Sequence, residues 1–138
     1  MSVDSAAPEL RFHHVGVACT DLATETAKMA PLGYAPEGPE FVDPVQGVRG
    51  LFLAGQSPRL ELLAPLGEGG VLAPWLKQGI KLYHLAYETP DLAGSIERLR
   101  AQRAKLMVAP VPAVAFGGRS IAFLMLPNRL LIELIALN

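Results

Sequence analysis

The sequence contains almost no cysteine and no excess of charge of either sign. Cys19 is the single cysteine among 138 residues, so the chain has no internal disulfide. We expect Cys19 to be a small buried residue of a cytoplasmic protein, in a reducing compartment. Twelve basic residues stand against 13 acidic ones, for a net charge of −1. This balance gives no indication of binding to nucleic acid or to an anionic membrane.

The sequence also lacks an uninterrupted apolar run of about 20 residues, the length that a membrane-spanning helix requires. The longest candidates are interrupted by Arg119, Pro127, Arg129 and Glu133. Residues 1–10 contain acids and no apolar run, so we expect a short, loosely ordered lead-in and not a signal peptide. Hydrophobic residues still make up 51% of the chain. We expect the excess to lie in a sheet core and a subunit interface.

Two stretches of the chain repeat one pattern, HHVGVACTDL and then YHLAYETPDL. His84 follows His14 by 70 positions, and Asp91 follows Asp21 by the same 70. Each copy is predicted to be a strand that carries a histidine, followed by an aspartate that caps a helix. The period is too long for a solenoid, so the repeat indicates two pseudo-symmetric halves.

The later parts of the two halves match as well. LELL surrounds Glu61 and IELI surrounds Glu133, so each acid lies between apolar residues. His14 and Glu61 are 47 positions apart, and His84 and Glu133 are 49 apart. One loop insertion explains the difference. Each half is therefore predicted to contribute one histidine and one glutamate to a shared site.

The predicted elements follow the same order in both halves: a strand, a helix and then about three strands. Pro- and Gly-rich segments at 37–49 and 109–118 are predicted to be loops. A short helix over 71–77, closed by Gly79, is predicted to link the halves. Beyond the two histidine strands, strands are predicted at 48–54, 60–63, 106–108, 120–126 and 130–137.

Alternation along the first strand favours His14 over His13 as the functional residue. His13 shares a predicted face with two valines that suit packing on a helix. His14 shares the other face with glycine and alanine, which leave open space in front of its ring. By the same alternation, Tyr83 is predicted to lie in the core on the face opposite His84.

Two imidazoles and two carboxylates suit a divalent first-row cation, namely Co, Ni, Zn, Mn or Fe. Four protein ligands leave two positions of an octahedral site open, so a bound ion could act on a substrate as a Lewis acid. The second acid argues against a 2-His-1-carboxylate oxygenase. Glu61 and Glu133 lie in apolar strands, where an unpaired charge is costly. The alternatives to a metal are a site that has lost its ion and pairing with Arg59 or Arg129.

These motifs resemble the vicinal oxygen chelate superfamily, which includes glyoxalase I, bleomycin resistance proteins, extradiol dioxygenases and methylmalonyl-CoA epimerase. The resemblance covers about residues 12–137 and begins with the strand HHVGVA and its following DL. LELLAPL, QGV and YHLA resemble the epimerase branch in particular. The resemblance implies an α+β fold of two βαβββ modules that form a cupped mixed sheet around a metal. Its ligands would be His14, Glu61, His84 and Glu133.

The resemblance also implies a domain organisation. We expect a single domain over residues 1–138, with a first module over about 12–66 and a second over about 82–137. A linker helix over about 70–79 would join them. An open cupped sheet leaves edges that need covering, so we expect a homodimer.

The epimerase chemistry that the resemblance implies is proton removal next to a thioester carbonyl and proton return on the other face. Glu133 is expected to serve as one base while it also binds the metal. The second base of the epimerases is a glutamate, and its position here is Gly50. Glycine accepts no proton, so Glu40, Asp43 and Glu88 are the candidates to replace it.

Three functions are compatible with the sequence. The first is a metal-dependent isomerase or epimerase-like enzyme that stabilises an enolate next to a carbonyl, and the second is a glyoxalase I-type lyase. The third is a non-catalytic protein that binds a small hydrophobic or antibiotic-like molecule. Arg119 and Phe116 are the candidate substrate-binding residues, because they flank a glycine pair. The alternative is that Arg119 is solvated and that Phe116 only covers the sheet.

Overall fold

The computed structural model describes residues 9–138, so the lead-in predicted over 1–10 lies almost entirely outside the described residues. In the first half, the elements are β1 (Arg11–Ala18), α1 (Leu22–Met29), η1 (Ala30–Leu32), β2 (Ala35–Pro36), β3 (Phe41–Asp43), β4 (Val48–Ala54) and β5 (Leu60–Pro65). After the linker helix α2 (Ala73–Gln78), the second half has β6 (Leu82–Thr89), α3 (Leu92–Ala101), β7 (Lys105–Pro112), η2 (Val114–Phe116), β8 (Ser120–Met125) and β9 (Leu131–Ala136).

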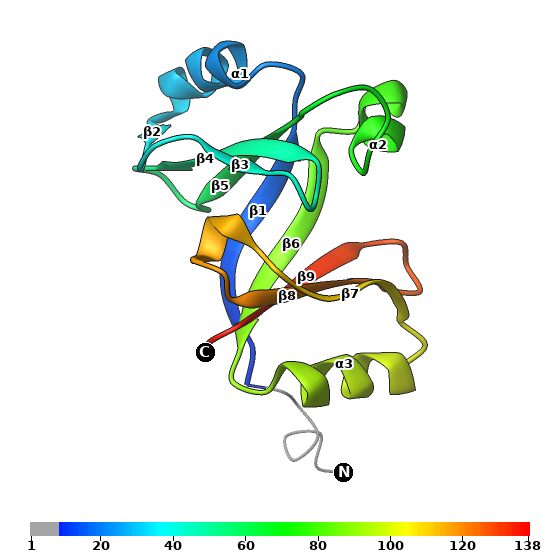
Figure 1. The fold of residues 1–138 in the computed structure, drawn as a ribbon. Helices are drawn as coiled ribbons and strands as arrows, with labels where there is room; N and C mark the ends of the chain where they lie inside the picture. The colour runs from blue at the N-terminus through cyan, green and yellow to red at the C-terminus, as the bar shows by residue number, and fades with distance from the viewer. Residues whose placement is uncertain (1–8) are drawn as a thin grey trace.

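The strands form one mixed sheet in the order β2-β4-β5-β1-β6-β9-β8-β7, with β3 paired to β4 off this path. β1 pairs in parallel with β5, and β6 pairs in parallel with β9. The two halves meet where β1 and β6 pair in an antiparallel manner. Figure 1 shows α1 and α3 at opposite ends of the molecule, with this seam between them. The predicted α+β fold of two pseudo-symmetric βαβββ modules in a cupped sheet is confirmed.

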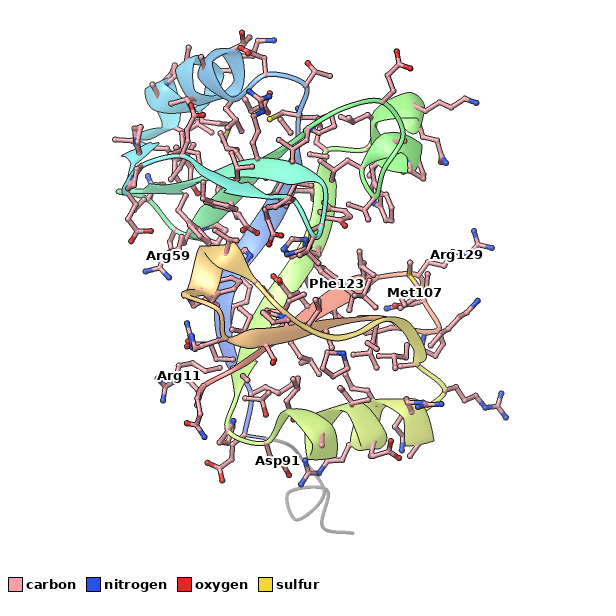
Figure 2. All side chains as sticks on the ribbon, in the orientation of Figure 1. Arg11, Arg59, Asp91, Met107, Phe123 and Arg129 are labelled. Atoms are coloured by element: carbon pink, nitrogen blue, oxygen red, sulfur yellow. The ribbon has the colours of Figure 1, made fainter. Side chains whose placement is uncertain are left out.

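The predicted caps define the starts of the two module helices. The Asp21 carboxylate accepts from the Thr24 amide at 2.8 Å, and the Asp91 carboxylate accepts from the Gly94 amide at 3.0 Å. Figure 2 shows Asp91 at the start of α3. Gly79 ends α2 in the left-handed region, with a φ of 72°, as the sequence predicted. Among the described residues, no helix is both long and apolar enough to cross a bilayer.

Each histidine strand carries one extra residue just before its histidine. In the pairing of β1 with β6, His13 and Tyr83 have no opposite residue. Such bulges turn a side chain out of the strict alternation of a strand. His13 Nδ1 lies 2.7 Å from His14 Nδ1, and the Tyr83 ring lies 4.8 Å from the His84 ring. The prediction that His13 and Tyr83 face away from the two histidines is therefore wrong, although Tyr83 is buried in the core.

Two predicted loops contain strand residues. β3 lies inside the segment predicted as a loop over 37–49, where Phe41 pairs with Gly50 of β4. β7 continues to Pro112, into the loop predicted over 109–118. β7 is an edge strand, and an edge tolerates prolines because one side of the strand needs no hydrogen-bond donors. The prediction of a loop over 109–112 is therefore wrong, because prolines are compatible with an edge strand.

Candidate metal centre

Four adjacent strands at the centre of the sheet each contribute one polar side chain to a common point. His14 and His84 come from β1 and β6, and Glu61 and Glu133 come from β5 and β9. Strand register explains the convergence. Glu61 lies opposite the residue two positions after His14, and Glu133 lies opposite the residue two positions after His84. The duplicated register places all four side chains on one face of the sheet, where the sequence predicted a shared site.

The donor atoms of the four residues are separated as ligands of one ion would be. His14 Nε2 lies 3.0 Å from Glu61 Oε1 and 3.4 Å from Glu133 Oε1. His84 Nε2 lies 3.2 Å from Glu133 Oε1, 3.4 Å from Glu61 Oε1 and 3.1 Å from His14 Nε2. All four ligand atoms lie within 4.8 Å of one another. Ligands bound at about 2.1 Å lie about 3 Å apart when they are at right angles around an ion.

The four side chains are buried, and one carboxylate oxygen has no hydrogen bond. At most 4% of the surface of any of these residues is exposed. Among the described residues, Glu133 Oε1 and His84 Nδ1 have no hydrogen-bond partner. The contacts of this oxygen are the two imidazole nitrogens at 3.2 and 3.4 Å, and a bound cation would neutralise its charge directly. Two carboxylates also balance the charge of a divalent ion, so the residues fit the predicted metal.

The electrostatics of the four residues show how strongly they interact. Burial lowers the pKa of His14, but the Glu61 and Glu133 carboxylates outweigh burial and raise the pKa to about 9. The pKa of His84 is raised in the same way. Burial raises the pKa of Glu61 and of Glu133, but the two imidazoles outweigh burial and lower both pKa values. Without an ion, the site therefore consists of imidazolium–carboxylate pairs, and a cation must displace the protons.

Gly16 provides the room that the second histidine needs. A Cβ added at Gly16 would lie 2.3 to 2.6 Å from three atoms of the His84 ring. The open space that the sequence predicted in front of His14 is therefore occupied by the ring of the other histidine.

A second layer of side chains supports His14. Arg59 Nη1 donates to His13 Nε2 at 3.0 Å, and Arg59 Nε lies 3.3 Å from Glu37 Oε1. Figure 2 shows Arg59 at the edge of the molecule. Burial, aided by the charges of His14 and Arg59, lowers the pKa of His13. Arg59 is thus paired with Glu37 and His13, and the alternative in which it neutralises Glu61 is not what the structure shows.

Phenylalanine rings surround the four residues. Phe52 lies opposite Glu61, and Phe123 lies opposite Glu133. The Phe52 ring lies 5.3 Å from the His14 ring, and the Phe123 ring lies 5.3 Å from the His84 ring. Neither ring was predicted to be part of the site, although the matching triplets Leu-Phe-Leu and Ala-Phe-Leu place one phenylalanine at the same point of each half.

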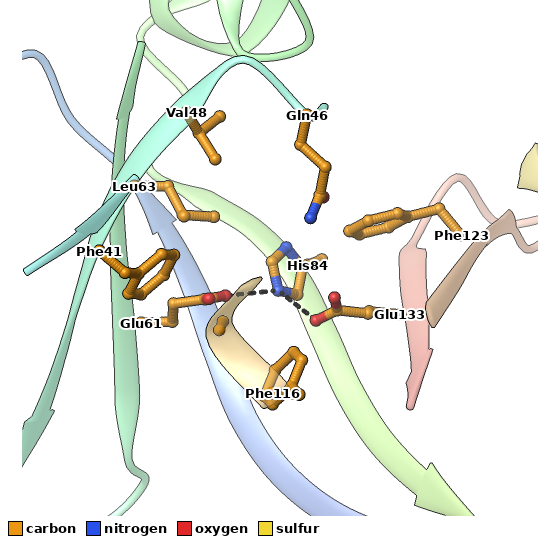
Figure 3. A pocket seen from close by; sticks show the side chains of 10 residues that line it. Phe41, Gln46, Val48, Glu61, Leu63, His84, Phe116, Phe123 and Glu133 are labelled. Atoms are coloured by element: carbon orange, nitrogen blue, oxygen red, sulfur yellow. Dashed lines mark ion pairs between the residues drawn. The ribbon is translucent and has the colours of Figure 1, made fainter. Parts of the chain in front are cut away.

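A small cavity of about 10 Å³, room for about one water or ion, adjoins three of the four residues, Glu61, His84 and Glu133. Figure 3 shows His84 between Glu61 and Glu133, with Phe41, Phe116 and Phe123 around them. The lining residues are Phe41, Gln46, Val48, Glu61, Leu63, His84, Ala115, Phe116, Phe123 and Glu133.

Of the two residues predicted to bind substrate, Phe116 lines this cavity and Arg119 does not. Arg119 Nη1 donates to the Ala136 carbonyl at 3.1 Å and to Glu88 Oε2 at 3.3 Å. Its Nε donates to the Phe116 carbonyl at 3.3 Å. Arg119 therefore ties η2 to the C-terminal strand, and its binding role stays a prediction.

The three acids considered as replacements for a base at Gly50 also lie outside the lining. The buried Asp43 carboxylate accepts from the backbone amides of Val45 and Val114. Glu88 is the partner of Arg119, and Glu40 lines a separate cavity with Arg49. The acids that line the cavity are Glu61 and Glu133.

Comparison with known proteins points to one family. A family model described as "Glyoxalase/Bleomycin resistance protein/Dioxygenase superfamily" matches residues 13–123. The chain is 29% identical over 116 residues to the ethylmalonyl-CoA/methylmalonyl-CoA epimerase of Cereibacter sphaeroides, across 83% of this chain and 87% of the relative. Methylmalonyl-CoA epimerase from Mycobacterium tuberculosis superposes with a TM-score of 0.75 at 29% identity, over 91% of this chain and 86% of that one. A hypothetical protein from Bacillus halodurans shares the fold, with a TM-score of 0.79 at 24% identity over 94% of this chain and 96% of that one.

Proposed function

The chain belongs to the glyoxalase/bleomycin resistance protein/dioxygenase superfamily, and on that basis we propose a metal-dependent enzyme of the epimerase type. It would stabilise an enolate next to the carbonyl of an acyl thioester. The observation that carries the proposal is the convergence of two buried imidazoles and two buried carboxylates within 4.8 Å. The curated relative and the Mycobacterium structure, both named as epimerases of CoA thioesters, support the reaction class.

In this proposal, one divalent ion binds to His14, Glu61, His84 and Glu133, and Co, Ni, Zn, Mn and Fe are the candidates. When bound, the ion supplies a Lewis acid that stabilises negative charge on a substrate carbonyl oxygen. Glu133 Oε1 adjoins the cavity and, among the described residues, contacts only the two imidazoles, which supports its assignment as the base that accepts the α-proton. The rings of Phe116 and Phe123 exclude bulk water from the place where that proton is held.

A glyoxalase I-type lyase is the second candidate. The feature that favours it is Gly50, because the pocket then lacks an acid at the position where the epimerases carry their second base. A non-catalytic protein that binds an antibiotic-like molecule is the third candidate, and it requires neither a metal nor a base.

Elemental analysis of the purified protein with His14→Ala and His84→Ala variants tests the metal site. We expect one equivalent of metal in the wild type and substoichiometric metal in both variants, with the fold retained by circular dichroism. Lys28→Ala, on the last turn of α1, is a matched control that should keep its metal. Equal metal content in the wild type and all three variants would refute the assignment of His14 and His84 as metal ligands.

Two activity measurements and one binding measurement separate the candidate functions. Incorporation of deuterium from solvent at the α-carbon of an acyl-CoA supports the epimerase-type enzyme. Turnover of the methylglyoxal–glutathione adduct supports the lyase. Metal-free protein that catalyses neither reaction, yet binds a hydrophobic ligand, supports the binding protein.

The same proposal includes the organisation of the chain. The two modules, over about 12–66 and 82–137, would form one domain joined by the linker helix over about 70–79. We also propose a homodimer in the cytoplasm, where a reducing environment suits the single buried Cys19.

A further inference from the structure

Two cavities share one wall at the metal centre. The inner cavity of about 10 Å³ is lined by Glu61, His84 and Glu133 of the four polar side chains. An outer groove of about 270 Å³ is lined by Glu37, Gly38, Pro39, Phe41, Phe52, Val114 and Ala115. Phe41 and Ala115 line both spaces. A substrate that reaches the inner cavity with its carbonyl would therefore lay its remaining substituent against Phe41, in the outer groove.

The position of Phe41 depends on the glycine at position 50. The two residues pair directly across β3 and β4. A Cβ added at Gly50 would lie 2.2 to 2.8 Å from three atoms of the Phe41 ring. The Phe41 ring also lies 6.0 Å from the Phe52 ring. The Phe41 ring therefore occupies the volume that a side chain at position 50 would fill, and the glycine at this position allows Phe41 to line the cavity.

Among the described residues, the linings of both cavities contain three carboxylates, Glu37, Glu61 and Glu133, and the imidazole of His84, but no lysine or arginine. The arginines of the neighbourhood have other partners, because Arg59 contacts His13 and Glu37 and Arg119 contacts Glu88. Glu61 and Glu133 already balance a divalent ion. A substrate with a further carboxylate would bring an uncompensated negative charge into a pocket of phenyl rings, which is costly.

We propose that Phe41, seated on Gly50, is the specificity-determining residue of this site, and that the substrate is an acyl thioester with an apolar α-substituent and no second carboxylate. This inference rests on the proposed function. A branched or aromatic substituent fills the outer groove between Phe41, Phe52 and Val114. The thioester chain leaves through the open side of the groove.

The test compares the binding of two thioesters to the metal-loaded protein by calorimetry. One probe is 2-phenylpropionyl-CoA, and the other is methylmalonyl-CoA, which shares the CoA group but carries a carboxylate. We expect the phenyl compound to bind about tenfold more tightly. Phe41→Ala should reduce that ratio to near unity, and Phe41→Leu should keep part of it, while both variants keep the metal content of the wild type. Val42→Ala is the control on the same strand, because Val42 is 54% exposed and lines neither cavity.

Equal or tighter binding of methylmalonyl-CoA by the wild type would overturn this inference and leave the proposed function standing. An unchanged ratio in Phe41→Ala would overturn the role of Phe41. Because the ratio is a binding measurement, it does not depend on turnover. Absence of deuterium exchange in both thioesters would refute the proposed function, and the ratio would still decide the specificity.

Discussion

Gly16 and His84 lie opposite each other in β1 and β6, and the His84 ring occupies the volume that a Cβ at position 16 would fill. The candidate metal ligand His84 therefore has its position because Gly16 of the first half has no side chain. The glycine is required by close approach and not by its backbone conformation, since its φ is not positive.

Gly16→Ala is therefore expected to displace the His84 ring and weaken metal binding at least about tenfold, since ligand geometry is held by the surrounding shell. A chelator competition assay measures the change. Gly67→Ala is the matched control, because a Cβ at Gly67 would meet nothing within 4 Å. Equal affinities in the two variants would contradict the steric role of Gly16.

His13→Ala is expected to weaken metal binding about tenfold without abolishing it, because partners in the outer layer orient a ligand and tune its basicity. His13 Nδ1 lies 2.7 Å from His14 Nδ1. The same competition assay should rank wild type above His13→Ala, and His13→Ala above His14→Ala. Phe12→Ala, at a neighbouring position that is 45% exposed, should bind like the wild type.

The metal-free protein is expected to be most stable between about pH 4.5 and 6.5, the ordinary pKa values of the paired acid and imidazole. The pKa of His14 is raised from 6.5 to about 9, so its stabilisation is complete below pH 6.5 and is lost as pH rises through 9. The pKa of Glu61 is lowered, so its stabilisation is present above pH 4.5 and is lost as pH falls further. The alkaline loss is on the order of 3 kcal/mol.

Thermal unfolding of chelator-treated protein across pH measures this effect. The alkaline decline should disappear in metal-loaded protein, where the ion replaces the protons, and should shrink in His14→Ala, where His84 still pairs with the carboxylates. A flat stability profile of the metal-free wild type between pH 6.5 and 9 would show that the imidazolium pairs do not form.

A homodimer should appear in light scattering as twice the chain mass. An apolar groove of about 620 Å³, lined by residues of both modules, is a surface that a second copy could cover. Leu82 lines it and is 69% exposed, so Leu82→Lys is expected to shift the protein to monomer. Val45→Lys is the control, since Val45 is equally exposed at 68% but lies outside the groove. A monomeric mass of the wild type at high concentration would refute the dimer.

The fold and the convergence of the four polar side chains could be predicted from the sequence, because both follow from the duplication. A 70-residue offset that preserves His14 and His84 also preserves strand order and register. The orientation of His13 could not be predicted in this way. Its bulge is a property of the pairing between two strands, whereas alternation is a property of one.

Phe41 was missed for a different reason. β3 is three residues long and lies in a segment rich in proline and glycine, so its local signal is that of a loop. Pairing with β4 makes it a strand, and only the empty volume above Gly50 brings its ring into the pocket.

The seam between β1 and β6 has a further consequence. Each module supplies one imidazole and one carboxylate, and neither holds more than half of the donor set. If the proposed ion binds, its affinity depends on the docking of the two halves, and a fragment cut at the linker would bind the ion only after reassociation with its complement. By the same geometry, a free-standing single module that pairs with itself across an equivalent seam would present the same four donors.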